Sequence, residues 1–357
     1  MLEFCRKKAE RAVIAGTIAA MCILAALATS LPASSKTITY AIIPKMLNNP
    51  VFTLAQRGAE AEARELEKEN PGTTYNIIYQ SSQTGQANEQ ADTISTLTDR
   101  HVDGMSISVI DANAVRGPIN DATREGIPVM CFDSDAPGTS RLTLYSVDDE
   151  KIGHELANEL ISAVGGAKAM TGEVAILSGQ SSAPNLQNRI KGVQEVLNSK
   201  NFPGVAFLPV LYCDDNIDKS IEEIRTTMQA HPNLRGFVFV GGWPLFAKNA
   251  LTGVNPKVTK IVSVDALPAE RDYLKSGLVY CLVGQKCFGW GQESVRILEK
   301  IRTGQLKSPP PFIDSGYDLV FNSPTSAQRK LAHGNIRVFS AGEYDKQWDK
   351  WNSTNPG

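Results

Sequence analysis

Residues that can bind a polar ligand recur at one kind of position in this chain, directly after a short apolar run. A carboxylate accepts hydrogen bonds from two hydroxyl groups at once, an amide both donates and accepts, and an aromatic ring offers a flat apolar face. Because a buried hydroxyl is costly unless it is hydrogen-bonded, a sugar needs a wall of this mixed kind, and the set suits a sugar better than a phosphate or a nucleotide. The candidate residues are Lys45, Asn49, Phe52, Asp133, Ser134, Asp215, Trp243, Asp265 and Gln285.

The elements that must position these residues alternate along the chain. Apolar, β-branched runs are separated by segments with helical periodicity, which predicts βαβ units and parallel sheets, and the rhythm restarts near residue 151. Ligands bind at the carboxyl ends of the strands in such sheets, so we expect the candidates to meet at that edge. The predicted strands are 38–43, 75–79, 103–109, 127–132, 173–178, 205–211, 235–240, 258–264 and 279–283.

Several candidates also have a purely structural interpretation. Asn49 before Pro50 is typical of a helix N-cap followed by proline at the first helical position. Asp133 and Asp265 could cap following helices, and Asp215 could equally cap a helix at 216–230. Trp243, beside Pro244, could belong to the core. The shared position at strand ends favours a site for the carboxylates.

The first 35 residues differ in kind from the rest. Basic residues between Arg6 and Arg11 precede an uncharged run at 12–28, and small, turn-forming residues follow it. This order predicts a secretory signal peptide over residues 1–35 and an exported protein. The alternative is a retained membrane anchor, because the apolar run approaches the ~20 residues that span a bilayer.

The length, charge and cysteine content of the chain exclude several classes of protein. A chain of 357 residues is long enough for two domains, and its 36 basic and 38 acidic residues show no nucleic-acid-binding stripe. Neither metal nor cofactor is predicted, because no cysteine or histidine spacing matches a metal site. The mature chain keeps Cys131, Cys213, Cys281 and Cys287, which could form disulfides or remain buried thiols.

Five stretches together resemble the type I periplasmic sugar-binding proteins, the family like ribose-binding protein. They are "LNNPVF", "IPVMCFDSDAP", "NRIKGV", "IVSVDALP" and "LVGQKCFGWG", in order over residues 36–320. The resemblance implies an α/β fold of two Rossmann-like lobes with parallel sheets, joined by a three-segment hinge. It divides the chain into a first lobe of 36–147 plus 286–315 and a second of 148–285 plus 316–357.

The resemblance also implies a function and assigns residues to it. Members close on a monosaccharide and deliver it to the permease of an ABC transporter, so contact with the membrane would run through the permease or a retained anchor. The family pattern assigns Asn49, Phe52, Asp133, Asp265 and Gln285 to the ligand, and it adds Arg189 on a helix of the second lobe.

Departures from the family pattern leave the identity of the sugar undetermined. Lys45 stands where many relatives have a small polar residue, and Ser134 where they have arginine. Val51 replaces the first aromatic residue of a pair, and Gly241 replaces a frequent asparagine, with Trp243 nearby. These changes affect which pentose, hexose or deoxysugar would bind, rather than the mode of binding.

Three rival functions have a weaker basis in the sequence. An α/β enzyme should show a glycine-rich phosphate loop or a nucleophile motif, and the chain has none. A sugar-responsive repressor would need a DNA-binding segment before residue 36, where the export signal stands. A membrane-anchored sensor or chemoreceptor partner would differ only in the fate of residues 12–28. We therefore expect a binding protein and not an enzyme.

Overall fold

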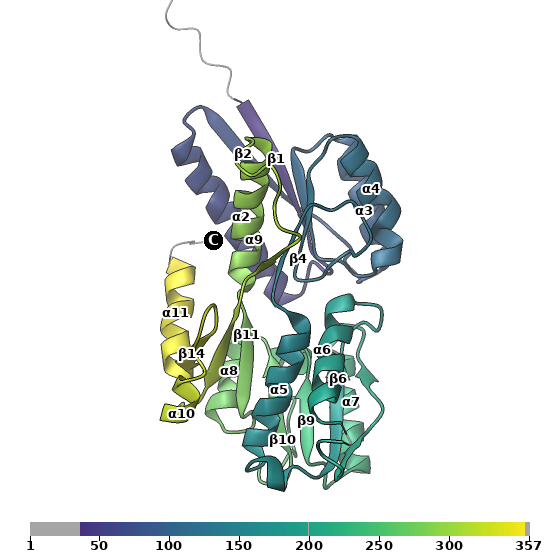
Figure 1. Ribbon diagram of the computed structural model, residues 1–357, viewed down its shortest axis with the longest axis vertical. Coiled ribbons are helices and arrows are strands. Elements are labelled where there is room, and N and C mark those ends of the chain that lie inside the picture. The colour runs from purple at the N-terminus through teal and green to yellow at the C-terminus, as the bar shows by residue number, and fades with distance from the viewer. Residues whose placement is uncertain (1–35, 199, 354–357) are drawn as a thin grey trace, which may run out of the picture.

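The computed structural model describes residues 36–198 and 200–353, which fold around two sheets of mostly parallel strands (Figure 1). The predicted α/β class with two sheets is confirmed. The predicted signal peptide, residues 1–35, lies outside the described residues. Within the described ranges, no helix combines the length and the apolar character needed to cross a membrane.

The first sheet contains six strands, all parallel to their neighbours, in the spatial order β12–β5–β4–β3–β1–β2. Side chains alternate between its two faces, and β3 and β4 are buried along their whole length, as a sheet covered on both sides requires. The strands are β1 (Lys36–Ile43), β2 (Thr73–Tyr79), β3 (Gly104–Ile107), β4 (Val129–Phe132), β5 (Leu144–Ser146) and β12 (Phe312–Asp314).

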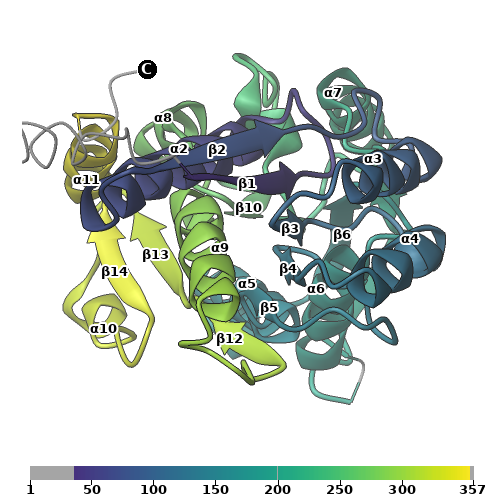
Figure 2. The same cartoon turned by 90° about the horizontal axis from the view of Figure 1, so that it is seen from above.

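Two helix pairs cover this sheet. On one face α2 (Pro50–Glu69) and α9 (Cys287–Arg302) pack over Tyr40, Ile42 and Phe132. On the other face lie α3 (Ala87–Asp99) and α4 (Ala112–Arg124) (Figure 2). These two helices enclose a separate apolar cluster. We call this sheet and its helices the first lobe.

The second sheet has the order β14–β13–β11–β10–β9–β6–β7, with β8 paired to β6. Its pairs are parallel except for β11 with β13. The strands are β6 (Gly172–Ser178), β7 (Val205–Phe207), β8 (Leu211–Tyr212), β9 (Gly236–Phe239), β10 (Lys260–Val264), β11 (Cys281–Gln285), β13 (Tyr317–Phe321) and β14 (Arg337–Ser340).

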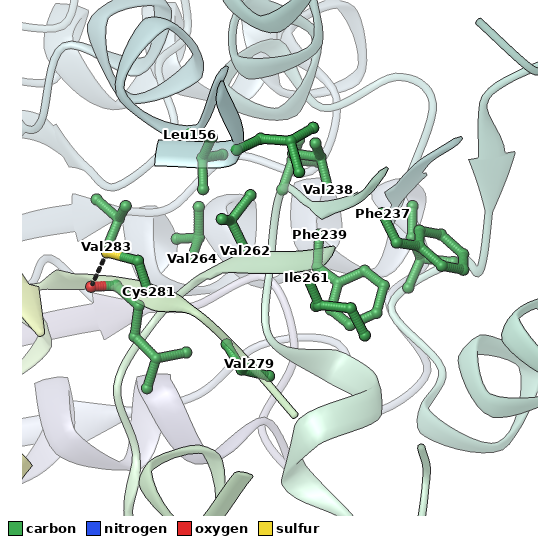
Figure 3. Packing of buried hydrophobic residues seen from close by; sticks show 14 of the residues in the cluster. Leu156, Phe237, Val238, Phe239, Ile261, Val262, Val264, Val279, Cys281 and Val283 are labelled. Atoms are coloured by element: carbon green, nitrogen blue, oxygen red, sulfur yellow. Dashed lines mark hydrogen bonds between the residues drawn. The ribbon is translucent and has the colours of Figure 1, made fainter. Parts of the chain in front are cut away.

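Helices cover both faces of the second sheet and complete the second lobe. Figure 3 shows Leu156 of α5 beside Val262 and Val264 of β10, in the largest apolar cluster among the described residues. The helices are α5 (Asp149–Ala163), α6 (Pro184–Val196), α7 (Ile217–Ala230), α8 (Pro268–Lys275), α10 (Ser326–Arg329) and α11 (Ala341–Ser353), with short 3-10 turns η1 (Ala167–Ala169) and η2 (Trp243–Phe246).

The chain passes between the two sheets three times. It leaves the first sheet after β5, returns after β11 to form α9 and β12, and leaves again between β12 and β13.

Three expectations about elements were wrong or incomplete. The strand expected at 205–211 is two short strands, because Pro209 has no N–H group to continue the ladder. The strand β5 escaped prediction. The segment after Ser323, for which no strand or helix is predicted above, adds β14 to the sheet and places Tyr344 of α11 in the core.

The four described cysteines are free thiols, all of them buried. Of the two alternatives that the sequence left open, the structure therefore has the buried thiols. Burial raises the pKa of the Cys131 thiol to about 12, so this residue is inert at neutral pH.

Candidate binding site

A polar cavity of about 30 Å³ lies between the two lobes, at the carboxyl ends of strands from both sheets. Every candidate from the sequence lines it except Ser134, which is fully buried with its hydroxyl unpartnered. The lining residues are Lys45, Asn49, Val51, Phe52, Asp133 and Trp290 from the first lobe and Asn185, Leu186, Arg189, Asp215, Gly241, Trp243, Asp265 and Gln285 from the second.

The wall of the first lobe centres on Asp133, which follows β4. Its carboxylate lies 3.3 Å from the Lys45 ammonium and accepts a hydrogen bond of 2.6 Å from the Ser108 hydroxyl. Asn185 of the second lobe joins the pair: its amide nitrogen donates to Asp133 at 3.2 Å, and its amide oxygen accepts from Lys45 at 2.8 Å. These contacts connect the two lobes directly.

The wall of the second lobe is organised by Arg189 of α6, which is 2% exposed. Its guanidinium donates to the Asp149 carboxylate at 2.8 Å, to the Val240 carbonyl at 3.0 Å and to the Gln285 amide oxygen at 2.7 Å. Gln285 in turn donates to Asp265 at 2.8 Å. One planar, five-donor group therefore fixes the orientation of a line of side chains that ends in the cavity.

Three of the lining carboxylates sit on strained backbone. Asp133, Asp215 and Asp265 have φ values of 57°, 58° and 75°, in the left-handed region that non-glycine residues rarely adopt. Such conformations cost about 1–3 kcal/mol each and cluster at ligand-binding sites. Since each aspartate ends a strand or its extension, the turn directs the carboxylate into the cavity.

Helix capping was the structural alternative for Asn49, Asp215 and Asp265. Asn49 is the N-cap of α2, because its side chain accepts from the Val51 amide at 3.2 Å, and it also lines the cavity. Asn216, not Asp215, caps α7, and Leu267 holds the N-cap position of α8. Asp215 and Asp265 therefore have no capping role.

Aromatic rings close the cavity from both lobes. Phe52 packs against Trp290, with ring centroids 6.0 Å apart, and Trp243 approaches from the second lobe. Glycine at 241 makes room for the indole, because a β-carbon there would lie 2.5 Å from the Trp243 ring. The Trp290 indole N–H has no hydrogen-bond partner among the described residues, so it is a buried donor that a ligand oxygen could satisfy.

Carboxylates outnumber cations around the cavity. Burial raises the pKa of Asp215 to about 6 and also raises the pKa of Asp265. Burial lowers the pKa of Arg189, but the attraction of Asp149, Asp133 and Asp265 outweighs it, and the net shift is upward. An acidic, donor-bearing cavity disfavours an anion and suits a neutral ligand that carries several hydroxyls.

The cavity is nearly filled by its own side chains. A volume of about 30 Å³ is close to the space of a single water molecule, so a ring-sized ligand requires the two walls to separate. A larger cavity of about 750 Å³ lies within the second lobe and shares none of these residues. The convergence of polar groups from both lobes makes the smaller one the candidate site.

Three contributing residues were missed in the sequence. Asn185 stands four residues before Arg189, and this spacing on a helix could have indicated a shared face. Trp290 lies inside a stretch that already carried the family resemblance. Asp149 gave no usable signal, because it follows Asp148, which caps α5.

Comparisons with known proteins agree with this geometry. The family model of the periplasmic binding protein domain matches residues 40–306. The ribose import binding protein of Salmonella typhimurium is 25% identical over 268 residues, covering 75% of this chain and 86% of the relative. The D-apiose import binding protein of Actinobacillus succinogenes is 25% identical over 267 residues, covering 74% and 82%.

A solved structure extends the agreement to three dimensions. An ABC transporter solute-binding protein from Burkholderia graminis, in complex with D-arabinose, superposes with a TM-score of 0.72 and 29% identity. The alignment covers 80% of this chain and 96% of that one.

Proposed function

This chain belongs to the periplasmic binding protein domain family, and from that premise we propose that it captures a monosaccharide between its two lobes. The observation that carries the proposal is the interlobe cavity, where carboxylates, amides, cations and aromatic rings converge from both lobes. Carboxylates on this wall would accept from sugar hydroxyls, Arg189 and Lys45 would donate to sugar oxygens, and Phe52 or Trp243 would contact the apolar face of the ring.

The proposed role is transport and not catalysis. Two relatives are import binding proteins, one for ribose and one for D-apiose, and the similar solved structure is an ABC transporter solute-binding protein in complex with D-arabinose. These similarities support delivery of the ligand to a permease.

A thermal-shift screen of the purified protein tests the ligand class. Because the named relatives bind pentoses, the screen starts with ribose, arabinose, xylose and apiose and continues to hexoses and deoxysugars. A ligand that binds only the folded form stabilises it by about 2.7 kcal/mol at a hundredfold excess over Kd, so we expect a clear rise in Tm for at least one sugar. Ribose 5-phosphate is the matched control and should be rejected by the acidic cavity; no response to any monosaccharide would contradict the proposal.

The same ligand should close the lobes around the proposed hinge. We propose a first lobe of residues 36–147 plus 286–315 and a second of 148–285 plus 316–357. The lobes must open from the arrangement in the structure to admit a sugar, and rigid-body closure on the sugar would then shorten this open form. Small-angle scattering on the sample from the screen should therefore show a smaller radius of gyration with the sugar bound than without it.

We also propose that the protein is exported to the periplasm and cut before about residue 36. The basic and then apolar order of the first residues supports this. N-terminal sequencing of the protein from a periplasmic extract should begin at or before residue 36 and after the apolar run. A cytoplasmic chain that retains Arg6 and Arg11 would contradict export, and a membrane-bound one would indicate the retained anchor.

A further inference from the structure

The cavity of about 750 Å³ in the second lobe is separate from the interlobe site. Side chains of α5, of β10, of the residues before β11 and of the α10 region line it, on the side of the second sheet that carries α5. Its volume lies within the ~300–1,000 Å³ that is usual for sites that bind small molecules.

One wall of this cavity carries two carboxylates a helical turn apart. Glu155 and Glu159 both project from α5, and Glu159 is only 4% exposed. The Glu159 Oε2 atom is buried without a hydrogen-bond partner among the described residues, whereas Glu155 accepts a hydrogen bond of 2.9 Å from the Tyr317 hydroxyl. A buried, unpartnered carboxylate oxygen is unfavourable unless a ligand satisfies it.

The protein supplies little positive charge to this pair. Lys260 also lines the cavity, but its ammonium group donates to the Pro256 carbonyl at 2.5 Å. Within the described ranges, no salt bridge joins Glu155 or Glu159 to a lysine, arginine or histidine. Burial raises the pKa of Glu159 to about 7, and the neighbouring Glu155 adds to this shift.

Another part of the cavity wall is apolar and aromatic. Tyr280 and Phe321 stand edge to face with ring centroids 6.1 Å apart, and the Tyr280 hydroxyl accepts from Gln328 at 3.2 Å. Leu278 and the partly exposed Leu331 complete this wall. A bare metal ion would make no contact with this apolar wall. It would also find too few oxygen ligands, since hard cations take six or more.

We propose that this cavity binds a small organic cation whose ammonium group meets Glu159 and Glu155 and whose aromatic part lies against Tyr280 and Phe321. The ammonium group supplies the missing donor to the buried carboxylate, and the ring covers the apolar wall. The inference is independent of the sugar proposal, because the two cavities share no residue.

Calorimetry on the whole protein at pH 8 tests this inference with matched pairs of probes. The amines are 2-phenylethylamine, tyramine and tryptamine, and the neutral counterparts are 2-phenylethanol, tyrosol and tryptophol. We expect at least one amine to bind about tenfold or more tightly than its alcohol, since a hydrogen bond to a charged group has about that effect. Glu159→Gln should abolish the preference, and Glu155→Gln should reduce it.

Glu150→Gln is the matched control, because Glu150 lies on the same helix but pairs with Lys191 at the surface. It should leave the preference for amines intact, and all three variants should keep the thermal response to the sugar. Binding of the amine should also tighten from pH 6 to pH 8, as Glu159 loses its proton. The titratable groups around Glu159 are Glu155 on α5, Lys260 on β10, Tyr280 and Cys281 at β11, Tyr317 on β13, and His333.

Equal affinity for amines and alcohols, an amine affinity that Glu159→Gln leaves unchanged, or no binding by any probe would each overturn the inference. Tight binding of calcium chloride without binding of the amines would likewise overturn it in favour of a metal site.

Discussion

Asp133→Asn is expected to weaken sugar binding about 100-fold or more without unfolding the protein. Asp133 is 4% exposed and lies within 3.3 Å of Lys45, so the substitution leaves a buried ammonium without its counter-charge. Loss of one partner from a buried ion pair costs about 3–5 kcal/mol, and part of that loss should appear in the affinity for the ligand. Calorimetry with the sugar identified by the screen gives the affinity, and circular dichroism checks the fold.

Asparagine is chosen over alanine because of the backbone at this position. With φ at 57°, residue 133 needs a side chain that tolerates the left-handed region, and asparagine does so. The new amide would place a donor opposite the Asn185 amide nitrogen, which now donates to Asp133. The loss of affinity is thus attributable to charge and hydrogen bonding and not to strain.

Asp135→Asn provides the control two residues along the chain. Asp135 pairs with Arg141 at 2.7 Å and does not line the interlobe cavity. The variant removes the same charge and should bind the sugar as the parent does. Parent-like binding by folded Asp133→Asn would mean that the ligand site lies elsewhere.

The residues at strand ends were the part of the site that was easiest to predict from the sequence. Parallel strands bring their carboxyl ends to one edge of each sheet, so Asp215 and Asp265 could be expected at that edge of the second sheet and Asp133 at that edge of the first. Apolar runs locate strands, and the residue that follows each run is then fixed to within a few positions. The left-handed backbone conformation at these aspartates directs their carboxylates into the cavity.

Contacts made by helix faces were harder to predict from the sequence. Asn185 and Trp290 reach the cavity from α6 and α9, and which face of a helix meets the other lobe depends on how the two lobes pack. The C-terminal segment was missed for a similar reason. The rings of Tyr344 and Trp348 contact the guanidinium of Arg271 on α8, which lies 73 residues or more earlier in the chain. No local sequence pattern predicts such a long-range pairing.

Ser134 marks the limit of reasoning from the family pattern. The family resemblance implied an arginine position here, and the residue follows a strand, so contact with the ligand was expected. In the structure its side chain is fully buried outside the cavity, while Lys45 and Arg189 supply the positive charge on the two walls. A shared position in a sequence pattern does not imply a shared direction of the side chain.

Arg189→Met is expected to lower both the stability of the protein and its affinity for the sugar. The methionine retains much of the apolar volume but removes the donors to Asp149, to Val240 and to Gln285. Asp149 would remain buried without its cation, which costs about 3–5 kcal/mol of unfolding free energy. Because Gln285 holds Asp265, the loss should also disorder the acceptors on the wall of the second lobe.

Lys191→Met, two residues further along α6, is the matched control. Lys191 pairs with Glu150 at the surface, where its side chain is 56% exposed, so this substitution should change the unfolding free energy by at most about 1 kcal/mol. Arg189→Lys separates charge from geometry: it keeps a cation but cannot reach three acceptors at once, so it should recover stability only in part.

The stability deficit of Arg189→Met should itself depend on pH. Burial raises the pKa of Asp149 in the folded protein, and without Arg189 the pKa should rise further. An acid whose pKa is higher in the folded state loses stability as pH rises from its unfolded pKa, near 3.8, towards its folded pKa, because the folded state must then give up a proton that it holds more tightly. Urea unfolding of parent and variant should show a larger deficit at pH 8 than at pH 5, where a protonated Asp149 needs no cation. A deficit equal at both pH values would mean that lost packing, and not an unpaired carboxylate, destabilises the variant.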